Sequence, residues 1–281
     1  MHRTDVLLVT DGEHAEGEPG HEVLDKELAK RGISSRWERW DDPHVGWGEA
    51  RLVAVRSAWD YDLRPQDFLT WASTVGSHLL HGAEVFRWNI DKGYLKELRQ
   101  LTPLPVVPTE TAHDLLSLRA AIGSFGQAIV KPRVGAGGRG IVLARDPQSF
   151  KPVDKGPWVV QPVVQSVMSE GEISVFCFNG RPVSQLRKVA SKKDYRCQEE
   201  YGGRSHLEPL APEIAVLAAD AVAATSEVVG TEIVYARIDL LRHDGVWSIS
   251  EVEVTEPGLY LEEIPGNADH FADALAARLG L

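Results

Sequence analysis

Apolar residues recur along the chain with two different periods, and these periods divide its first third into alternating strands and helices. Helical spacing predicts one helix that ends near Gly32 and another from about 66 to 75. Around them, short apolar or β-branched runs predict buried strands at 5–10, 33–37 and 52–56. This alternation of strand and helix predicts a parallel sheet.

The pattern after these elements predicts several smaller units. They are a short strand at 84–86, helices at 89–101 and 112–122, strands at 128–131, 141–144 and 158–161, hairpins of 172–178 with 182–189 and of 235–241 with 246–252, and helices at 212–229 and 267–279. Pro103, Pro105 and Pro108 mark an extended connection and a subdomain boundary. The polar, basic stretch 190–206 has no hydrophobic period and predicts a long mobile loop, either functional or a disordered insertion.

Composition and charge restrict the class of protein. The 281 residues are 43% hydrophobic, which is enough for a sizeable core shared among two or three subdomains. A formal net charge of −11 argues against a nucleic-acid or anionic-membrane partner. Cys177 and Cys197 lack disulfide or zinc spacing, no apolar run is long enough to cross a bilayer, and the amino terminus lacks signal-peptide features. We therefore expect a cytoplasmic protein, monomeric or homodimeric.

The first candidate for chemistry is the stretch IVKPRVGAGGRG at 129–140. A strand reaches Lys131, and the loop after it contains Gly135, Gly137, Gly138 and Gly140. Glycines let main-chain N–H groups approach a phosphate closely. A dinucleotide-binding motif would open into a helix, and a protein-kinase loop would precede its lysine, whereas 141–144 reads as a strand. We interpret the loop as a hairpin tip at a phosphate site, with a plain flexible turn as the alternative.

A second candidate lies where the strands of the predicted parallel sheet end, because ligands gather beyond the carboxyl ends of such strands. The loops there carry Asp11, Arg56 and Tyr61. Arg56 could hold a substrate carboxylate or be an ordinary solvated arginine, and its position favours neither reading. Lys92 falls in the first turn of the helix predicted at 89–101, where a cation opposes the helix dipole. That conflict is tolerable if Lys92 serves an anion, although a lysine reaching into water is the commoner case.

Three acidic residues interrupt the apolar strands of the last predicted hairpin. Burying unpaired carboxylates is costly, so Asp239, Glu251 and Glu253 predict a bound cation. Glu251 and Glu253 are two apart and therefore share one face of their strand. A two-residue Asp244-Gly245 turn would pair Asp239 with Ser250 and turn Glu251 to the opposite face. We therefore predict an odd-numbered loop or a bulge, and a raised pKa for at least one of these carboxyls in the absence of metal.

In this order, the lysines, glycine hairpin, strand ending at 161–164, basic stretch and acidic hairpin resemble the ATP-grasp superfamily, which includes glutathione synthetase, D-alanine:D-alanine ligase and the ribosomal-protein glutamate ligase. The resemblance covers nearly the whole chain. It implies an α/β fold with a parallel-sheet, substrate-binding domain at 1–102, a central lid subdomain at 103–165 and a C-terminal subdomain at 166–281. The last two subdomains, each α+β, would clasp ATP between them.

The resemblance also implies roles for individual residues. For ATP, these are phosphate contacts from Lys92 and Lys131, a lid at 135–140, adenine recognition by Gln161, Val163 and Val164, and a ribose contact from Glu172. For the reacting groups, they are Lys188 and Arg196 beside the transferred phosphate, Asp239, Glu251 and Glu253 on one or two Mg²⁺ ions, and Asp11, Arg56, Tyr61 and Gly203 around the substrate. Most members end the metal motif as E-x-N, whereas this chain has E-x-E, which makes its site more anionic. With the stretch VRSAWDY at 55–61, this feature resembles a branch that includes the cycloserine-forming cyclo-ligase.

Such a site implies an ADP-forming carboxylate-amine ligase. The carboxylate of a small amino-acid-like substrate would attack the γ-phosphorus of ATP, and an amine would then displace phosphate from the acyl phosphate. An amine in the same molecule gives a ring and a separate amine gives an amide or dipeptide, and the sequence leaves both open. A small-molecule kinase and a non-catalytic nucleotide sensor are further alternatives, although the complete acidic set argues against the sensor.

Overall fold

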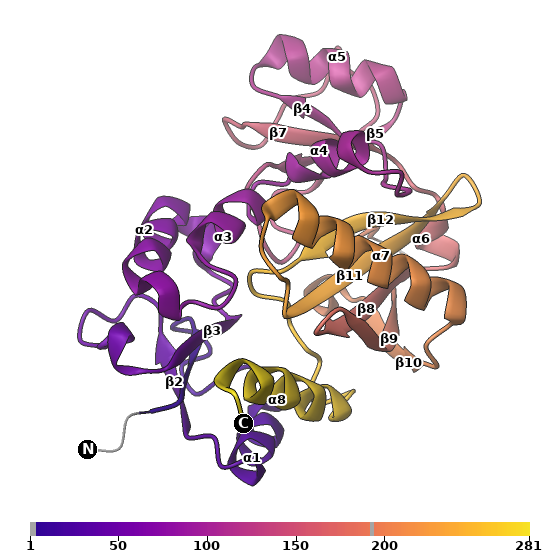
Figure 1. Ribbon diagram of the computed structural model, residues 1–281. Coiled ribbons are helices and arrows are strands. Elements are labelled where there is room, and N and C mark those ends of the chain that lie inside the picture. The colour runs from indigo at the N-terminus through magenta and orange to yellow at the C-terminus, as the bar shows by residue number, and fades with distance from the viewer. Residues whose placement is uncertain (1–3, 192–193) are drawn as a thin grey trace.

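Three β-sheets organise the chain in this computed structural model, which describes residues 4–191 and 194–281 (Figure 1). The first sheet belongs to the amino-terminal part, the second to the central part and the third to the carboxyl-terminal part. In Figure 1 the central part stands above the other two, and the amino-terminal part lies beside the carboxyl-terminal one.

The amino-terminal sheet is parallel, as predicted, with the strand order β2-β1-β3. Its elements are β1 (Val6–Thr10), α1 (His21–Lys30), β2 (Ser35–Arg39), β3 (Leu52–Ser57), α2 (Pro65–Val75) and three short 3-10 helices, η1 (Trp47–Glu49), η2 (Tyr61–Leu63) and η3 (Gly76–His78). All of β1 is buried because both faces of the sheet are covered by helices. Val6 and Leu8 pack with apolar residues of α1, whereas Leu7 and Val9 pack with those of α2.

Two predictions in the next segment are wrong. The residues predicted as a strand at 84–86 form helix α3 (Ala83–Asn89), and the helix predicted at 89–101 begins only at Tyr94, as α4 (Tyr94–Leu101). Three residues are too few to show a period, and the helix instead buries Val85, Phe86 and Asn89. Lys92 therefore lies in the connection before α4, where its main-chain N–H donates to the carbonyl of Arg133 (2.7 Å).

The central sheet has the order β4-β7-β5-β6 and carries the predicted glycine hairpin. Its elements are β4 (Glu110–Ala112), α5 (Leu115–Phe125), β5 (Ala128–Pro132), β6 (Val142–Ala144) and β7 (Trp158–Pro162). Strands β5 and β6 are antiparallel, with Ala128 opposite Ala144, so the loop between them is a hairpin tip as predicted. Helix α5 starts later than predicted because the side chain of Asp114 accepts the Ser117 N–H and caps it.

The carboxyl-terminal sheet is antiparallel, with the order β10-β9-β8-β11-β12. Its elements are α6 (Ser166–Ser169), β8 (Glu172–Phe178), β9 (Arg181–Val189), η4 (Glu199–Tyr201), β10 (Arg204–Glu208), α7 (Pro212–Val229), β11 (Tyr235–His243) and β12 (Val246–Glu253). The bounds of α7 match the predicted helix. The loop predicted at 190–206 extends too far, because its last residues begin β10, a mostly exposed edge strand that needs no hydrophobic period. Lys192 and Lys193 lie outside the described residues.

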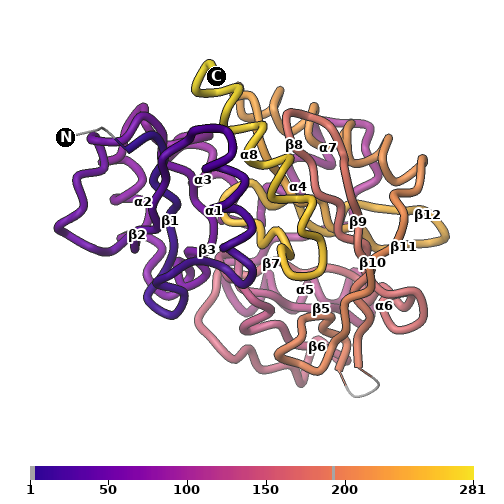
Figure 2. Tube along the Cα trace, turned by 90° about the horizontal axis from the view of Figure 1, so that it is seen from below, coloured from indigo at the N-terminus to yellow at the C-terminus, as the bar shows by residue number. Residues whose placement is uncertain are grey.

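Two helices pack against parts of the molecule that are distant from them in sequence. Helix α8 (Gly266–Leu279) returns to the amino-terminal part and lies beside α1 in both views (Figures 1 and 2). Arg31 of α1 there forms ion pairs with Asp269 (2.6 Å) and Asp273 (2.7 Å) of α8. Helix α4 buries its apolar side in the core of the carboxyl-terminal part. No helix among the described residues has the length and apolarity needed to span a membrane.

Candidate active site

The acidic hairpin contains the predicted bulge. Asp244 and Gly245 form a two-residue turn with positive φ angles (50° and 80°), and the ladder that starts there reaches Leu240 opposite Ile249. The register then shifts, so that Asp239 lies opposite Glu251. The extra residue at 250 thus restores Asp239 to the face that carries the two glutamates, and the prediction of a bulge is confirmed.

Asp239, Glu251 and Glu253 each offer one carboxylate oxygen, and these oxygens lie within 4.8 Å of one another. Carboxylate oxygens are ligands that Mg²⁺ prefers, so the donor set fits this ion. Burial, reinforced by the neighbouring carboxylates, raises the pKa of Glu253 to about 8 despite the nearby Arg237. The predicted rise in one pKa is therefore confirmed in direction, with burial contributing more than repulsion between the carboxylates, and an added cation would offset both.

Arg237 is a member of this cluster that sequence reasoning missed. Its guanidinium donates to both oxygens of Asp239 (3.0 Å from Nε to Oδ1 and 2.9 Å from Nη2 to Oδ2), and it also contacts Glu253. Burial would raise the pKa of Asp239, but Arg237 and Lys188 hold it well below its usual value. Its position offered a signal, because Arg237 precedes Asp239 by two residues and must share its strand face. Arg196, the arginine chosen from the sequence, instead pairs with Asp194 (2.7 Å).

Three lysines approach the acidic hairpin from different elements. Lys92 forms an ion pair with Glu251. Lys188 of β9 lies 2.5 Å from Glu172 and 3.4 Å from Asp239, with its Nζ between their oxygens. Lys131 of β5 forms no salt bridge within residues 4–191 and 194–281, and burial lowers its pKa. Lys131 is therefore a half-buried cation without a salt-bridge partner among these residues, and a phosphate could supply the missing counter-ion.

The glycine loop between β5 and β6 contacts the amino-terminal part. Arg139 donates from Nε to Asp62 (3.0 Å) and from Nη2 to the carbonyl of Trp59 (2.7 Å), and the Ala136 N–H also reaches Asp62 (3.2 Å). Gly137, Gly138 and Gly140 have positive φ angles of 57°, 70° and 71°, which side chains would disfavour. The loop therefore bridges the central sheet and the loop after β3.

Comparison with protein families agrees with this arrangement. Residues 91–265 match the family described as prokaryotic glutathione synthetase, ATP-grasp domain. The chain belongs to the ATP-grasp ligase family. Members of this family are enzymes that form carbon–nitrogen bonds and generally use ATP with Mg²⁺. Residues 6–81 match a second family, described as the N-terminal domain of D-cycloserine synthetase DcsG.

Individual proteins are also similar to this ATP-grasp ligase. The cycloserine biosynthesis protein DcsG of Streptomyces lavendulae is 29% identical over 276 residues, covering 88% of this chain and 90% of that protein. A glutathione synthetase of Mesorhizobium japonicum is 29% identical over 128 residues, covering 43% of this chain and 39% of that protein. The crystal structure of D-cycloserine synthetase DcsG has a TM-score of 0.87 at 26% identity, covering 98% and 99% of the two chains. The D-alanyl-alanine synthetase A of Vibrio cholerae shares the fold, with a TM-score of 0.69 at 14% identity and coverage of 100% and 98%.

The residues predicted to read adenine connect the central and carboxyl-terminal sheets of the ligase. Gln161 is buried at the end of β7, and its side-chain amide donates to the Thr109 hydroxyl (3.0 Å). Val164 is buried, and the Val163 N–H donates to the carbonyl of Gln127 (3.4 Å). Their contact with adenine, and that of Glu172 with ribose, remain predictions.

Two residues predicted to bind substrate have internal partners in the structure, which argues against their predicted contact with substrate. Arg56 has no exposed surface, since its guanidinium pairs with Glu18 (2.8 Å) and donates to the carbonyl of Pro257 (2.8 Å). Asp11 accepts N–H groups of His14 (2.8 Å) and Trp59 (3.1 Å), which ties together the loops after β1 and β3. Both residues therefore shape the amino-terminal part.

Gly203 lies in a tightly packed stretch of main chain and its contact with substrate stays a prediction, whereas Tyr61 lies beside the acidic hairpin. A Cβ atom on Gly203 would lie 2.1 Å from the carbonyl oxygen of Cys197, so the main chain packs there without room for a side chain. Tyr61 is buried, and its hydroxyl lies at the carboxyl group of Glu256, just after β12. Glu256 is a further residue that sequence reasoning did not include in the site.

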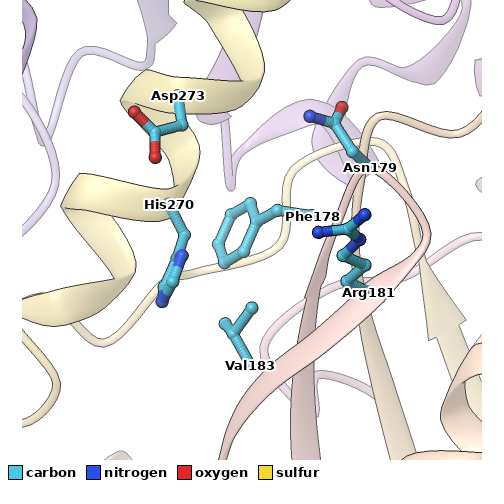
Figure 3. Close-up of a pocket in the computed structure, with 6 residues that line it drawn as sticks. All are labelled: Phe178, Asn179, Arg181, Val183, His270 and Asp273. Atoms are coloured by element: carbon cyan, nitrogen blue, oxygen red, sulfur yellow. The ribbon is translucent and has the colours of Figure 1, made fainter.

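A surface hollow of about 410 Å³ lies between the β8–β9 turn and α8 (Figure 3). Its lining residues are Phe178, Asn179, Arg181, Val183, His270 and Asp273. None of them belongs to the acidic hairpin or to the three lysines that approach it. The hollow is therefore separate from the candidate active site.

Proposed function

We propose that this enzyme is an ADP-forming ligase that closes a ring within an amino-acid-like substrate, as a cycloserine-type cyclo-ligase. The observation that carries this proposal is the likeness to DcsG over both halves of the chain, including the amino-terminal domain. The ATP-binding part is shared with many ligases, whose structures match less closely, with TM-scores of 0.61 to 0.69. The amino-terminal likeness therefore favours a DcsG-like substrate.

The charged residues around the hairpin suit activation of a carboxylate by ATP. Asp239, Glu251 and Glu253 would hold Mg²⁺, which on binding would help neutralise the phosphates. Lys131 would contact the phosphates, because it is a half-buried cation without a salt-bridge partner among the described residues. We assign Arg237, in place of Arg196, to the charge that develops on the transferred phosphoryl group, since it already lies among the metal-binding carboxylates.

The proposed reaction has two steps. First, a substrate carboxylate oxygen attacks the γ-phosphorus of ATP, the bond to the bridging oxygen breaks, and ADP leaves. Next, an amine nitrogen of the same molecule attacks the acyl-phosphate carbon, phosphate leaves with the bonding electron pair, and the nitrogen loses a proton. These residues contribute chiefly by positioning and charge stabilisation, which need no Ser-His-Asp set.

The cycloserine ring indicates the substrate class. It contains one bond between a carbonyl carbon and a nitrogen that is attached to oxygen, and opening this bond with water gives a serine whose side-chain oxygen carries an amino group. We therefore expect O-amino-D-serine or its ureido derivative to be a substrate. Ligation of two separate molecules is the alternative within the same chemistry, and a small-molecule kinase is the alternative outside it.

The test is an ADP-release screen over amino acids and their hydroxylamine and ureido derivatives, with mass analysis of the products. With O-amino-D-serine we expect equal amounts of ADP and phosphate and a product smaller than the substrate by one water. A linear product that joins two molecules would replace cyclisation with intermolecular ligation. ADP with a phosphorylated product and no free phosphate would identify a kinase and refute the proposal.

A further inference from the structure

Glu256 occupies a fixed position between the acidic hairpin and the amino-terminal part. The Trp59 indole donates to the main-chain carbonyl of Glu256 (3.0 Å), and Arg56 donates to the next carbonyl, that of Pro257 (2.8 Å). These contacts hold the loop from its main chain and leave the Glu256 side chain free for another purpose. That side chain is nevertheless only 8% exposed.

The carboxyl group of Glu256 has few partners for a buried acid. Burial raises the pKa of this carboxyl, the nearby Tyr61 hydroxyl opposes that rise, and no salt bridge to Glu256 occurs within residues 4–191 and 194–281. Lys92, a neighbouring cation, is paired with Glu251. An ionised carboxylate can accept several hydrogen bonds, and burying it without a cation is costly. The group is therefore incomplete until a cationic ligand arrives.

Glu256 is distinct from the candidate metal ligands. The three carboxylates whose oxygens converge within 4.8 Å are Asp239, Glu251 and Glu253, and Glu256 is not among them. It is associated instead with Tyr61 in η2, next to Asp62, the residue that contacts the glycine loop. Glu256 thus lies on the amino-terminal side of the site, where a substrate would meet the transferred phosphate.

We propose that Glu256, positioned by Tyr61, binds the α-ammonium group of the substrate. This inference rests on the proposed ligase function, and it restricts the substrate to zwitterionic amino acids with a free α-amino group. An ammonium ion supplies three hydrogen-bond donors and the missing positive charge. With the ammonium held at Glu256, the substrate carboxylate is left to face Lys131 and the metal-binding hairpin. Glu256 is therefore a specificity-determining residue and Tyr61 a positioning residue.

The experiment compares two compounds that differ only in the α-amino group, O-amino-D-serine and 3-(aminooxy)propanoic acid. ADP release gives kcat/KM for each with the wild-type enzyme, and the ratio measures preference for the ammonium. We expect a preference of about 30-fold or more, as for a buried hydrogen-bonded charge pair. In Glu256→Gln the preference should fall to a few-fold, with KM for ATP unchanged. Glu256→Asp should restore part of it, and Tyr61→Phe should reduce it less than Glu256→Gln does.

Glu262→Gln is the matched control, because Glu262 is an exposed residue further along the same connection. This variant should keep the wild-type preference. A preference that survives in Glu256→Gln would overturn the inference, because the ammonium would then be bound elsewhere. The inference would also be overturned if the wild-type enzyme released ADP equally well with both compounds, or with neither. Cyclisation itself is scored separately from product mass, so a linear product with intact ammonium preference would refute only the proposed ring closure.

Discussion

Two groups of buried charges in this protein look alike in sequence but differ in how their charges are balanced. Around β3, Arg56 pairs with Glu18, and Asp11 accepts main-chain N–H groups, so the protein itself satisfies these groups. Around β11 and β12, Glu253 has a raised pKa and Lys131 a lowered one, because burial outweighs the attraction of their partners. The balanced group stabilises the fold, and we expect a ligand to complete the unbalanced one. The two groups differ because distant parts of the chain supply partners for the first group and not for all members of the second.

The largest expected effect is that of Lys131→Ala, which should separate activity from stability. Removing this cation should lower kcat/KM at least about 10²-fold to 10³-fold, the range for loss of one charge-stabilising group. The unfolding midpoint in urea should stay the same or rise, because Lys131 is half-buried, has no salt-bridge partner among the described residues and has a pKa lowered by burial. Lys155→Ala, on an exposed part of the same subdomain, serves as the control. If the variant turned over normally or did not fold, Lys131 would not have the assigned role of a phosphate-binding cation.

Arg56→Ala should show the opposite behaviour. It leaves the Glu18 carboxylate buried and unpaired, which typically lowers the free energy of unfolding by about 3–5 kcal/mol. Arg87→Ala, at a half-exposed pair with Glu84, should cost less than about 1 kcal/mol. Chemical denaturation measures both. If the Arg56→Ala enzyme were stable, and its KM were raised for the amino-acid substrate but not for ATP, Arg56 would bind the substrate after all.

Acid should lower the free energy of unfolding through His81. This buried histidine donates from Nδ1 to the Val254 carbonyl (2.8 Å) and accepts the Val234 N–H at Nε2 (2.9 Å), and burial lowers its pKa to about 4. The unfolded chain binds this proton below about pH 6.5 but the folded chain does not, so the contribution is full above pH 6.5 and is lost as the pH falls. Between pH 7 and 5 it should lower the free energy of unfolding by about 2 kcal/mol.

His81→Gln keeps a donor and an acceptor at this position but cannot take up the proton. The pH dependence of urea unfolding should therefore be weaker in the variant than in the wild type, by about the amount assigned to His81. Equal dependence in the two proteins would show that other groups cause the acid sensitivity.

The smallest effect should come from the contact between the glycine loop and the amino-terminal part. The loop buries little apolar surface, so we expect it to be mobile without nucleotide, and Asp62→Asn should increase amide hydrogen exchange over 134–139 about two- to five-fold. The effect is modest because Arg139 is half-exposed. Asp67→Asn, an exposed acid nearby, should leave the exchange unchanged. No increase in Asp62→Asn would show that the contact does not restrain the loop.

The acidic hairpin was predictable because strand geometry is strict. Asp239 and Glu251 can share a face beside an Asp-Gly turn only if a residue is inserted, and the bulge follows from this condition. The same rule would have identified Arg237, two residues before Asp239, had it been applied to cations as well. The long helix α7 was predictable because it has many turns and clear ends at Pro212 and Gly230.

Other features depended on contacts that the sequence does not display. The helix at 83–89 was missed because the three residues 84–86 are too few to show a period, and because its Asn89 donates to the carbonyl of Val252 in β12 (2.6 Å). Arg56 resembled a ligand-binding arginine because Glu18 and Pro257 are far from it in sequence. Glu256 was overlooked because its isolation depends on which residues surround it in the folded chain.

The return of α8 to the amino-terminal sheet affects how the chain folds during translation. Domains usually fold as units as they leave the ribosome, the first-made before the last. Here Val6 and Leu8 of the first strand share a core with Phe271 and Leu275 of α8, which contains 14 residues at the end of the described chain. Helix α1 covers only part of this face of the first sheet, so the face is incomplete until α8 has been made. The first part of the chain to be synthesised therefore depends on residues made after β12.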